Sequence, residues 1–255
     1  MRSDRRPVKD PRTVAREIPG LFDALFPTLK GGFVHALNSR AYACERGIDI
    51  GAYAFGSVTM RLSLLFEVAV ARAESLVAGE ADPDWGLCLS IAAERQRRHF
   101  DVRVPDELET SDKDAADRVA QNLAAMLDEL RNDWSESAIV VRPRIPGYEW
   151  IASSEGDFAI GSTLIEVKCI QGNFGLADYR QVLMYWLLSY ASAIERNKNE
   201  WRHLALLNPR RNIVVHFGID EIVGFITHDA SKLEVLQLFV TLVEESSLNL
   251  LAVTG

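Results

Sequence analysis

Two carboxylates and a lysine in the middle of the chain are candidates for metal-dependent chemistry. Glu166 and Lys168 lie two residues apart in a run typical of a β-strand. Because side chains alternate along a strand, these two share one face. Asp157 precedes them across Gly161-Ser162, which we expect to form a two-residue hairpin turn. In that register Asp157 lies opposite Glu166, with the Cβ atoms about 5 Å apart.

Like charges at that separation destabilise a sheet unless a positive charge lies between them. A hard cation, Mg²⁺ or Mn²⁺, takes oxygen ligands and fits Asp157, Glu166 and the backbone carbonyl of Val167. Such a cation can polarise a phosphodiester and lower the pKa of a water molecule. Lys168 can orient that water and stabilise the charge that develops on the phosphate. The pattern therefore indicates phosphodiester hydrolysis.

The same residues have a simpler interpretation. Glu-x-Lys is common in strands, and a solvated ion pair on an edge strand would contribute little to stability and need no catalysis. The next helix favours the chemical interpretation. Gln181 and Tyr185 lie four residues apart and so share one face of the helix that follows the strand. Taken alone, they would be a surface glutamine and a half-buried tyrosine.

Together these residues resemble the PD-(D/E)XK nuclease superfamily, specifically its RecB-like branch. The match consists of Asp157, Glu166-Val167-Lys168 and Gln181-x-x-x-Tyr185, within about residues 115–210. The resemblance implies that the two acids and the lysine form the catalytic core, and that Gln181 and Tyr185 lie beside it and help to position substrate. It also implies Mg²⁺ or Mn²⁺ as cofactor and a restriction-endonuclease-like αβ sandwich.

One feature departs from the family pattern and another is left open. Gly156 stands where the family often has a proline before the first acid. Many members add a further acid from the preceding helix. On the helix that we expect at 115–131, Asp117, Asp128 and Glu129 are all available.

The order of the elements predicts an α/β fold. Hydrophobic periodicity and turn residues indicate helices near 57–78, 84–99, 115–131, 177–196 and 231–245, and strands near 138–142, 148–152, 157–160, 163–170, 203–207, 213–217 and 222–226. This order favours an αβ sandwich with a central mixed sheet over residues 113–255. Residues 1–112 are expected to form a mainly helical N-terminal region of unknown role.

Composition limits the class of protein. The net charge of −8 disfavours a strong non-specific binder of nucleic acid, because neutralising phosphates supplies most of that affinity. It does not exclude a metal nuclease, whose carboxylates the cation partly neutralises. Three scattered cysteines argue against a zinc site or a disulfide framework and suit a reducing cytoplasm. No apolar run reaches the length of a membrane span, so we expect no membrane association.

Basic residues outside the motif are candidate DNA contacts. Arg142 and Arg144 flank the predicted site strand and could touch DNA. For the run from Arg95 to His99, a solvated helix terminus is the favoured interpretation, because cations stabilise a helix C-terminus.

The sequence therefore predicts a Mg²⁺-dependent deoxyribonuclease of the cytoplasm, acting in bacterial antiviral defence or restriction, or in DNA processing. DNA is the expected partner, and a helicase, an ATPase or another subunit of a defence complex is a candidate companion. The alternative is a catalytically inactive subunit of nuclease fold that binds nucleic acid or protein in a larger complex. The acidic net charge and the unassigned N-terminal region favour that alternative.

Overall fold

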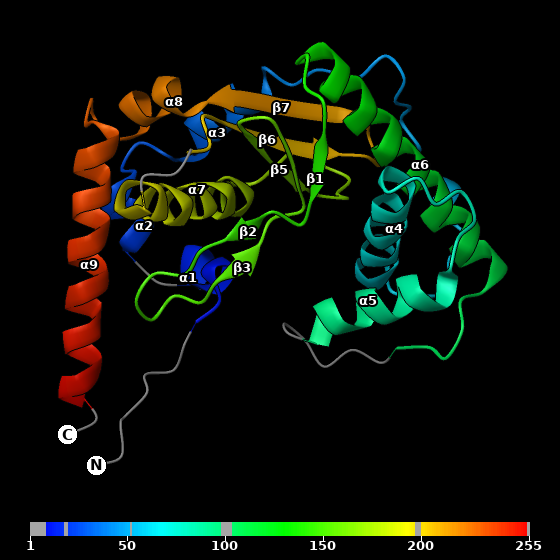
Figure 1. Ribbon diagram of the computed structural model, residues 1–255, viewed down its shortest axis with the longest axis horizontal. Coiled ribbons are helices and arrows are strands. Elements are labelled where there is room, and N and C mark those ends of the chain that lie inside the picture. The colour runs from blue at the N-terminus through cyan, green and yellow to red at the C-terminus, as the bar shows by residue number, and fades with distance from the viewer. Residues whose placement is uncertain (1–8, 18–19, 52, 98–103, 197–199, 254–255) are drawn as a thin grey trace.

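The computed structural model describes residues 9–17, 20–51, 53–97, 104–196 and 200–253, and it has an α/β fold. A five-stranded sheet lies at the centre, with helices on both faces (Figure 1). β5 and β6 run parallel, and the other neighbouring strands run antiparallel. The predicted α/β class and central mixed sheet are thus confirmed.

The sheet has the strand order β1-β4-β5-β6-β7. Its members are β1 (Ile139–Val141), β4 (Phe158–Ile160), β5 (Thr163–Val167), β6 (His203–Asn208) and β7 (Ile213–Gly218). A separate antiparallel ribbon joins β2 (Arg144–Ile145) to β3 (Ser154–Glu155).

Nine α-helices surround the sheet in the described part of the chain. They are α1 (Pro11–Glu17), α2 (Leu21–Leu25), α3 (Gly31–Asn38), α4 (Leu62–Val77), α5 (Trp85–Arg97), α6 (Thr110–Asp133), α7 (Leu176–Arg196), α8 (Ile219–Ile226) and α9 (Lys232–Val253). A short 3₁₀ turn covers Tyr53–Phe55. Among the described residues, no helix is both long and apolar enough to cross a membrane.

The β4–β5 hairpin has the predicted register. Ala159 pairs with Leu164 and Phe158 with Ile165, around the turn that begins at Gly161. Gly161 has a φ of +54°, in the left-handed region that glycine adopts without a steric penalty. The register therefore brings the residue just before β4 next to the end of β5, where the candidate acids lie.

The two faces of the sheet pack against different helices. Leu164, Leu204 and Leu206 belong to a core formed with α1, α2, α3, α7 and α9. Ile165 and Ala205, which alternate with them, belong to a second core built largely from α6. Figure 1 shows this division, with α7 and α9 on one side of the sheet and α6, α4 and α5 on the other.

The first 112 residues contribute to both sides of the molecule. α1, α2 and α3 lie in the same apolar cluster as α7. α4 and α5 instead form a third apolar cluster with the first turns of α6. Contacts therefore cross residue 112 in two separate places, and the division of the chain into regions 1–112 and 113–255 stays a prediction.

Two predicted strands are wrong. Residues 222–226 belong to α8, where Ile219, Ile222, Val223 and Ile226 are buried at helical spacing. Their β-branched side chains resemble a strand in composition, but the spacing of three and four residues favours a helix. Residues 148–152 form no strand either, and only isolated bridges involve Tyr148 and Ile151.

Candidate active site

Glu166 is the most deeply buried charged residue of the predicted site. It lies on the α7 face of β5 with only 1% of its side chain exposed. Its Oε1 accepts hydrogen bonds from Lys168 Nζ at 2.8 Å and from Gln181 Nε2 at 2.6 Å. Its Oε2 is buried and has no hydrogen-bond partner among the residues that the structure describes. A buried carboxylate oxygen without a donor is costly, so this atom calls for an explanation.

Asp157 lies at the start of β4, half-buried at the edge of a cleft. Its Oδ2 accepts a hydrogen bond from the backbone N–H of Val167 at 2.7 Å. The N–H and C=O of one strand residue point to the same side, so the Val167 carbonyl lies on the edge of β5 that faces Asp157. The three groups that the sequence proposes as metal ligands therefore belong to one small region.

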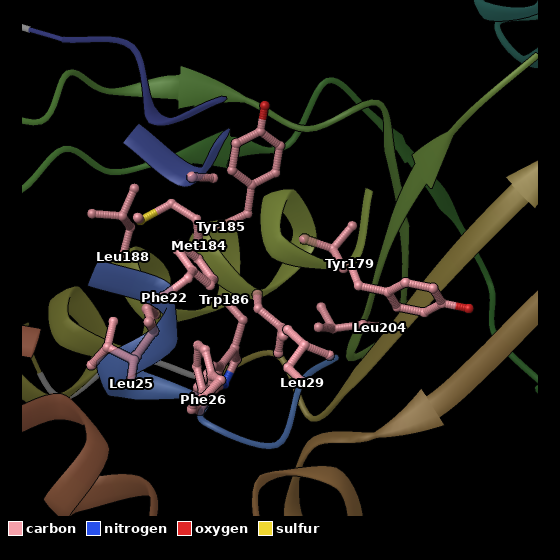
Figure 2. Packing of buried hydrophobic residues seen from close by; sticks show 14 of the residues in the cluster. Phe22, Leu25, Phe26, Leu29, Tyr179, Met184, Tyr185, Trp186, Leu188 and Leu204 are labelled. Atoms are coloured by element: carbon pink, nitrogen blue, oxygen red, sulfur yellow. The ribbon is translucent and has the colours of Figure 1, made fainter. Parts of the chain in front are cut away.

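Gln181 and Tyr185 are fully buried on α7, unlike the surface glutamine and half-buried tyrosine of the simpler interpretation. Asp178, the third residue of α7, accepts a hydrogen bond from the Gly175 N–H and so caps the helix. In Figure 2, Tyr185 leaves α7 on the side opposite to Trp186. Its hydroxyl accepts a hydrogen bond from Gln181 Nε2 at 3.2 Å.

The Gln181 amide connects the hairpin to the helix. Its nitrogen donates to Glu166 and to Tyr185. Its oxygen accepts from Lys168 Nζ at 3.0 Å. The structure thus brings the predicted residues of β5 and α7 into one hydrogen-bonded network, beside Asp157.

Two further residues of the network come from α1, and the sequence reasoning missed them. Arg12 Nε donates to the Tyr185 hydroxyl at 2.9 Å, and Arg16 Nη2 donates to Gln181 Oε1 at 3.0 Å. Arg12 Nη2 also lies 3.6 Å from Glu166 Oε1. The pair has i, i+4 spacing on a short helix, which is a weak signal and does not indicate a partner 173 residues away.

The two carboxyl groups differ in charge. Burial and the neighbouring Glu166 raise the pKa of Asp157 to about 7, although Arg12 and Lys168 act to lower it. Burial also acts to raise the pKa of Glu166, but Lys168 and Arg12 outweigh that effect and lower it. Near neutral pH Glu166 is therefore negatively charged, and Asp157 is protonated in only part of the molecules.

Tyr185 stays protonated in this environment. Burial and the charge of Glu166 raise its pKa to about 12, although Arg12 acts to lower it. Because the hydroxyl oxygen already accepts two hydrogen bonds, it serves the network as a neutral acceptor that holds Arg12 and Gln181 in place.

A cleft of about 350 Å³ opens beside Asp157. Its walls come from α1, from α4 and α5, and from the segment around β2 and β3. The residues that line it are mostly charged or polar: Asp10, Arg12, Thr13, Arg16, Glu67, Glu74, Arg95, Gln96, Arg142, Ser154, Glu155, Gly156 and Asp157. The helical N-terminal region therefore forms much of the approach to the site.

The structure separates the acids left open on α6 from the site. Asp117 pairs with Arg72, and Asp128 pairs with Arg46. Glu129 accepts hydrogen bonds from the backbone around residues 45–46. The acidic side chains that share the cleft with Asp157 are instead on other elements, and two of them, Glu67 and Glu74, come from α4.

The arginines considered for DNA have different positions. Arg142 lines the cleft and forms an ion pair with Glu155, whereas Arg144 is exposed on β2 and does not line the cleft. Arg95 is not the solvated terminus that we expected. It lines the cleft and donates to both carboxylate oxygens of Glu74 at 2.7 Å. Residues 98–99 of the same basic run lie outside the described residues.

The residues present fit a hard divalent cation. In the described part of the chain, no group of three or more His, Cys, Asp or Glu side chains could hold a metal ion. Mg²⁺, however, is commonly bound by one or two carboxylates and keeps several waters. The unpartnered Oε2 of Glu166 beside Asp157 is the atom that such an ion would satisfy. The donors are all oxygens, which disfavours zinc or copper.

Comparison of the chain with protein-family models, with curated proteins and with solved structures found no match.

Proposed function

We propose that the protein is a divalent-metal-dependent deoxyribonuclease. The observation that carries the proposal is the buried Glu166 carboxylate, which has one oxygen held by Lys168 and Gln181 and the other without a partner in the described part of the chain. A buried charge with only one of its oxygens hydrogen-bonded does not stabilise the fold, since removing an ion from water costs roughly several kcal/mol. Such groups cluster at functional sites.

In this proposal Asp157, Glu166 and the Val167 carbonyl hold Mg²⁺ or Mn²⁺. The bound cation supplies Lewis acidity toward a phosphodiester and makes a water molecule more acidic. Lys168 keeps its ammonium fixed by Glu166 and Gln181 and donates a hydrogen bond toward the reacting phosphate. Gln181 and Tyr185 hold the lysine and the glutamate in that arrangement. The cleft beside Asp157 admits the substrate.

The choice of nucleic acid rests on two supports. Arginines from α1, from α5 and from the segment between β1 and β2 line the cleft and suit a chain of phosphates. The resemblance of the Asp157, Glu166-Val167-Lys168 and Gln181/Tyr185 pattern to RecB-like nucleases favours DNA, a restriction-endonuclease-like fold, and a role in bacterial defence or DNA processing.

The test is cleavage of DNA by the purified full chain with Mg²⁺ or Mn²⁺ and with a chelator. We expect cleavage only with the metal. An Asp157→Asn variant should stay folded but lose at least about 100-fold in rate, as enzymes do without one group that stabilises charge in the transition state. Asp128→Asn is the matched control, because Asp128 is an exposed acid of α6 whose partners are Arg46 and Arg131. Its cleavage rate should equal that of the wild type.

Two results would count against the proposal. Full activity of Asp157→Asn would remove the site from the reaction. DNA binding that is the same with metal and with chelator, with no cleavage in either, would favour the inactive subunit of nuclease fold.

A further inference from the structure

α1 presents two arginines to the site on one face. Arg12 and Arg16 are four residues apart, so they lie one above the other along the helix, about 6 Å apart in rise. Between them Val14 and Ala15 are buried and anchor α1 in the core that it shares with α7. The two guanidinium groups are therefore held by the fold beside Gln181 and Tyr185.

Each guanidinium uses only part of its donor capacity. Arg12 donates through Nε to Tyr185, and its Nη2 stays at 3.6 Å from Glu166, beyond hydrogen-bond distance. Arg16 donates through Nη2 to Gln181, with Asp178 at 3.9 Å. An arginine has five N–H donors in a planar fork that fits a phosphate through two of them. Within the described ranges, both residues thus have donors left for a ligand.

Both side chains also reach the cleft. The side chains of Arg12 and Arg16 are 28% and 43% exposed, and both line the cleft with Asp157. Two other arginines of the cleft are more completely engaged by acids. Arg95 binds both oxygens of Glu74, and Arg142 pairs with Glu155. The α1 pair is therefore the better placed to accept an anion.

We propose that Arg12 and Arg16 form a phosphate clamp for a single nucleic-acid strand. Arg12 binds the phosphate that lies at Asp157, and Arg16 binds the adjacent phosphate of the same strand. The identity of the ligand rests on the proposed nuclease function, while the two anion contacts rest on α1 alone. The clamp assigns to the N-terminal region a role in setting the path of the strand through the cleft.

The experiment measures binding of a short fluorescent single-stranded deoxyoligonucleotide in chelator, so that no cleavage occurs, over a series of salt concentrations. Each phosphate contact contributes about 0.7 to the slope of log affinity against log salt for single strands. We expect Arg12→Gln and Arg16→Gln each to weaken binding several-fold and to lower the slope by about 0.7. Arg12→Lys should keep the slope, because the charge remains, and lose affinity, because the fork is gone.

Arg40→Gln is the matched control, because Arg40 is an exposed arginine that pairs with Glu221 and does not line the cleft. It should change neither affinity nor slope. An oligonucleotide with uncharged methylphosphonate linkages should bind the wild type and the variants equally weakly. Melting temperatures show whether each variant is folded. If Arg12→Gln does not fold, the more exposed Arg16 and the Arg12→Lys variant decide the question.

The clamp is overturned by unchanged slopes in the folded glutamine variants, which would leave the arginines as structural partners of α7. Failure of the wild type to bind the oligonucleotide overturns it as well. The proposed nuclease function is judged separately. Reduced slopes in the variants without any cleavage by the wild type would support the clamp and contradict the nuclease function. Cleavage by the wild type with unchanged slopes in the variants would support the nuclease function and contradict the clamp.

Discussion

The two faces of β5 differ in chemistry although their residues alternate along one short strand. Toward α6, Ile165 and Val167 pack in an apolar cluster with Leu123 and Leu127. Toward α7, Glu166 and, just beyond the strand, Lys168 form a network of buried charges and amides.

The difference separates residues that stabilise the fold from residues that the fold must accommodate. Burying an apolar side chain contributes about 1.5–3 kcal/mol to stability. Burying an ion pair commonly contributes nothing or less than an apolar pair of the same volume. The apolar side chains of β5, Leu164 on the α7 face as well as Ile165 and Val167 on the α6 face, therefore stabilise the sheet, whereas the charged residues Glu166 and Lys168 are explained by chemistry.

The largest expected effect concerns activity and separates the two faces directly. Lys168→Ala should lower the cleavage rate by about 1,000-fold, because a donor aimed at developing charge contributes roughly 4 kcal/mol to the barrier. Ile165→Ala, its matched change on the other face, should leave the rate per folded molecule within a few-fold of the wild type. Single-turnover cleavage by protein of known folded fraction measures both. Equal losses in the two variants would abolish the distinction between the faces.

The next effect is on stability, and here the variant on the α6 face should lose more than the variant on the α7 face. Ile165 is fully buried, so Ile165→Ala should lower the free energy of unfolding by about 2–5 kcal/mol through lost burial and a cavity. Urea denaturation monitored by circular dichroism gives the value. A loss below about 1 kcal/mol would mean that packing of Ile165 against α6 contributes less to stability than its burial predicts.

The pH dependence of stability should reveal the buried acids of the α7 face. Burial and Glu166 raise the pKa of Asp157 from 3.8 to about 7, so the folded protein holds a proton that the unfolded chain releases above about pH 4. The stability that this proton contributes is therefore complete below pH 4 and is lost as the pH rises through 7. We expect the free energy of unfolding to fall by roughly a few kcal/mol over this range. Urea denaturation in chelator from pH 4 to 8 measures the slope. Asp157→Asn should remove it, and an unchanged slope in that variant would assign it to another group.

The smallest effect has the opposite sign and lies on the α6 face. His216 of β7 stacks on Trp134, and burial, with the nearby His203 and Arg40, lowers its pKa to about 4. In the unfolded chain His216 therefore takes up a proton near pH 6.5, whereas in the folded protein it does so only near pH 4. The free energy of unfolding consequently falls as the pH drops from 6.5 to 4. Because the side chain is partly open to water, we expect about 1 kcal/mol. His216→Gln should flatten this limb of the stability curve, and persistence of the limb would contradict the assignment.

Local pattern was enough to predict the centre of the fold. Alternation along β5, the glycine turn and the apolar stripe of α6 each depend on neighbours within a few residues, and the hairpin register and that helix are as expected. The stretch 222–226 was misassigned because its β-branched composition outweighed its helical spacing. Local propensity gives way there to packing of the apolar face of α8 in the core.

The candidate site could be predicted only in part for the same reason. Asp157, Glu166 and Lys168 are joined by one hairpin, and Gln181 and Tyr185 by one helix turn, so spacing alone relates them. Arg12 and Arg16 reach the site through tertiary packing, and nothing in the sequence relates them to α7. Tertiary packing also places Glu67 and Glu74 of α4 in the cleft wall. The candidate acids on α6 do not line the cleft: Asp117, Asp128 and Glu129.

The hydrogen bond between Arg12 and Tyr185 joins residues 173 positions apart. On the ribosome, α1 is therefore made long before its partner helix, by roughly 10 to 30 s at ordinary rates of synthesis. During that interval the hairpin can form, because it is local, but the arginines have nothing to bind. Contacts of such high sequence separation are among the last to form. The site is therefore complete only after synthesis has passed α7, and a nascent chain stalled between β5 and α7 carries the acids and the arginines but lacks Gln181 and Tyr185, to which the arginines donate.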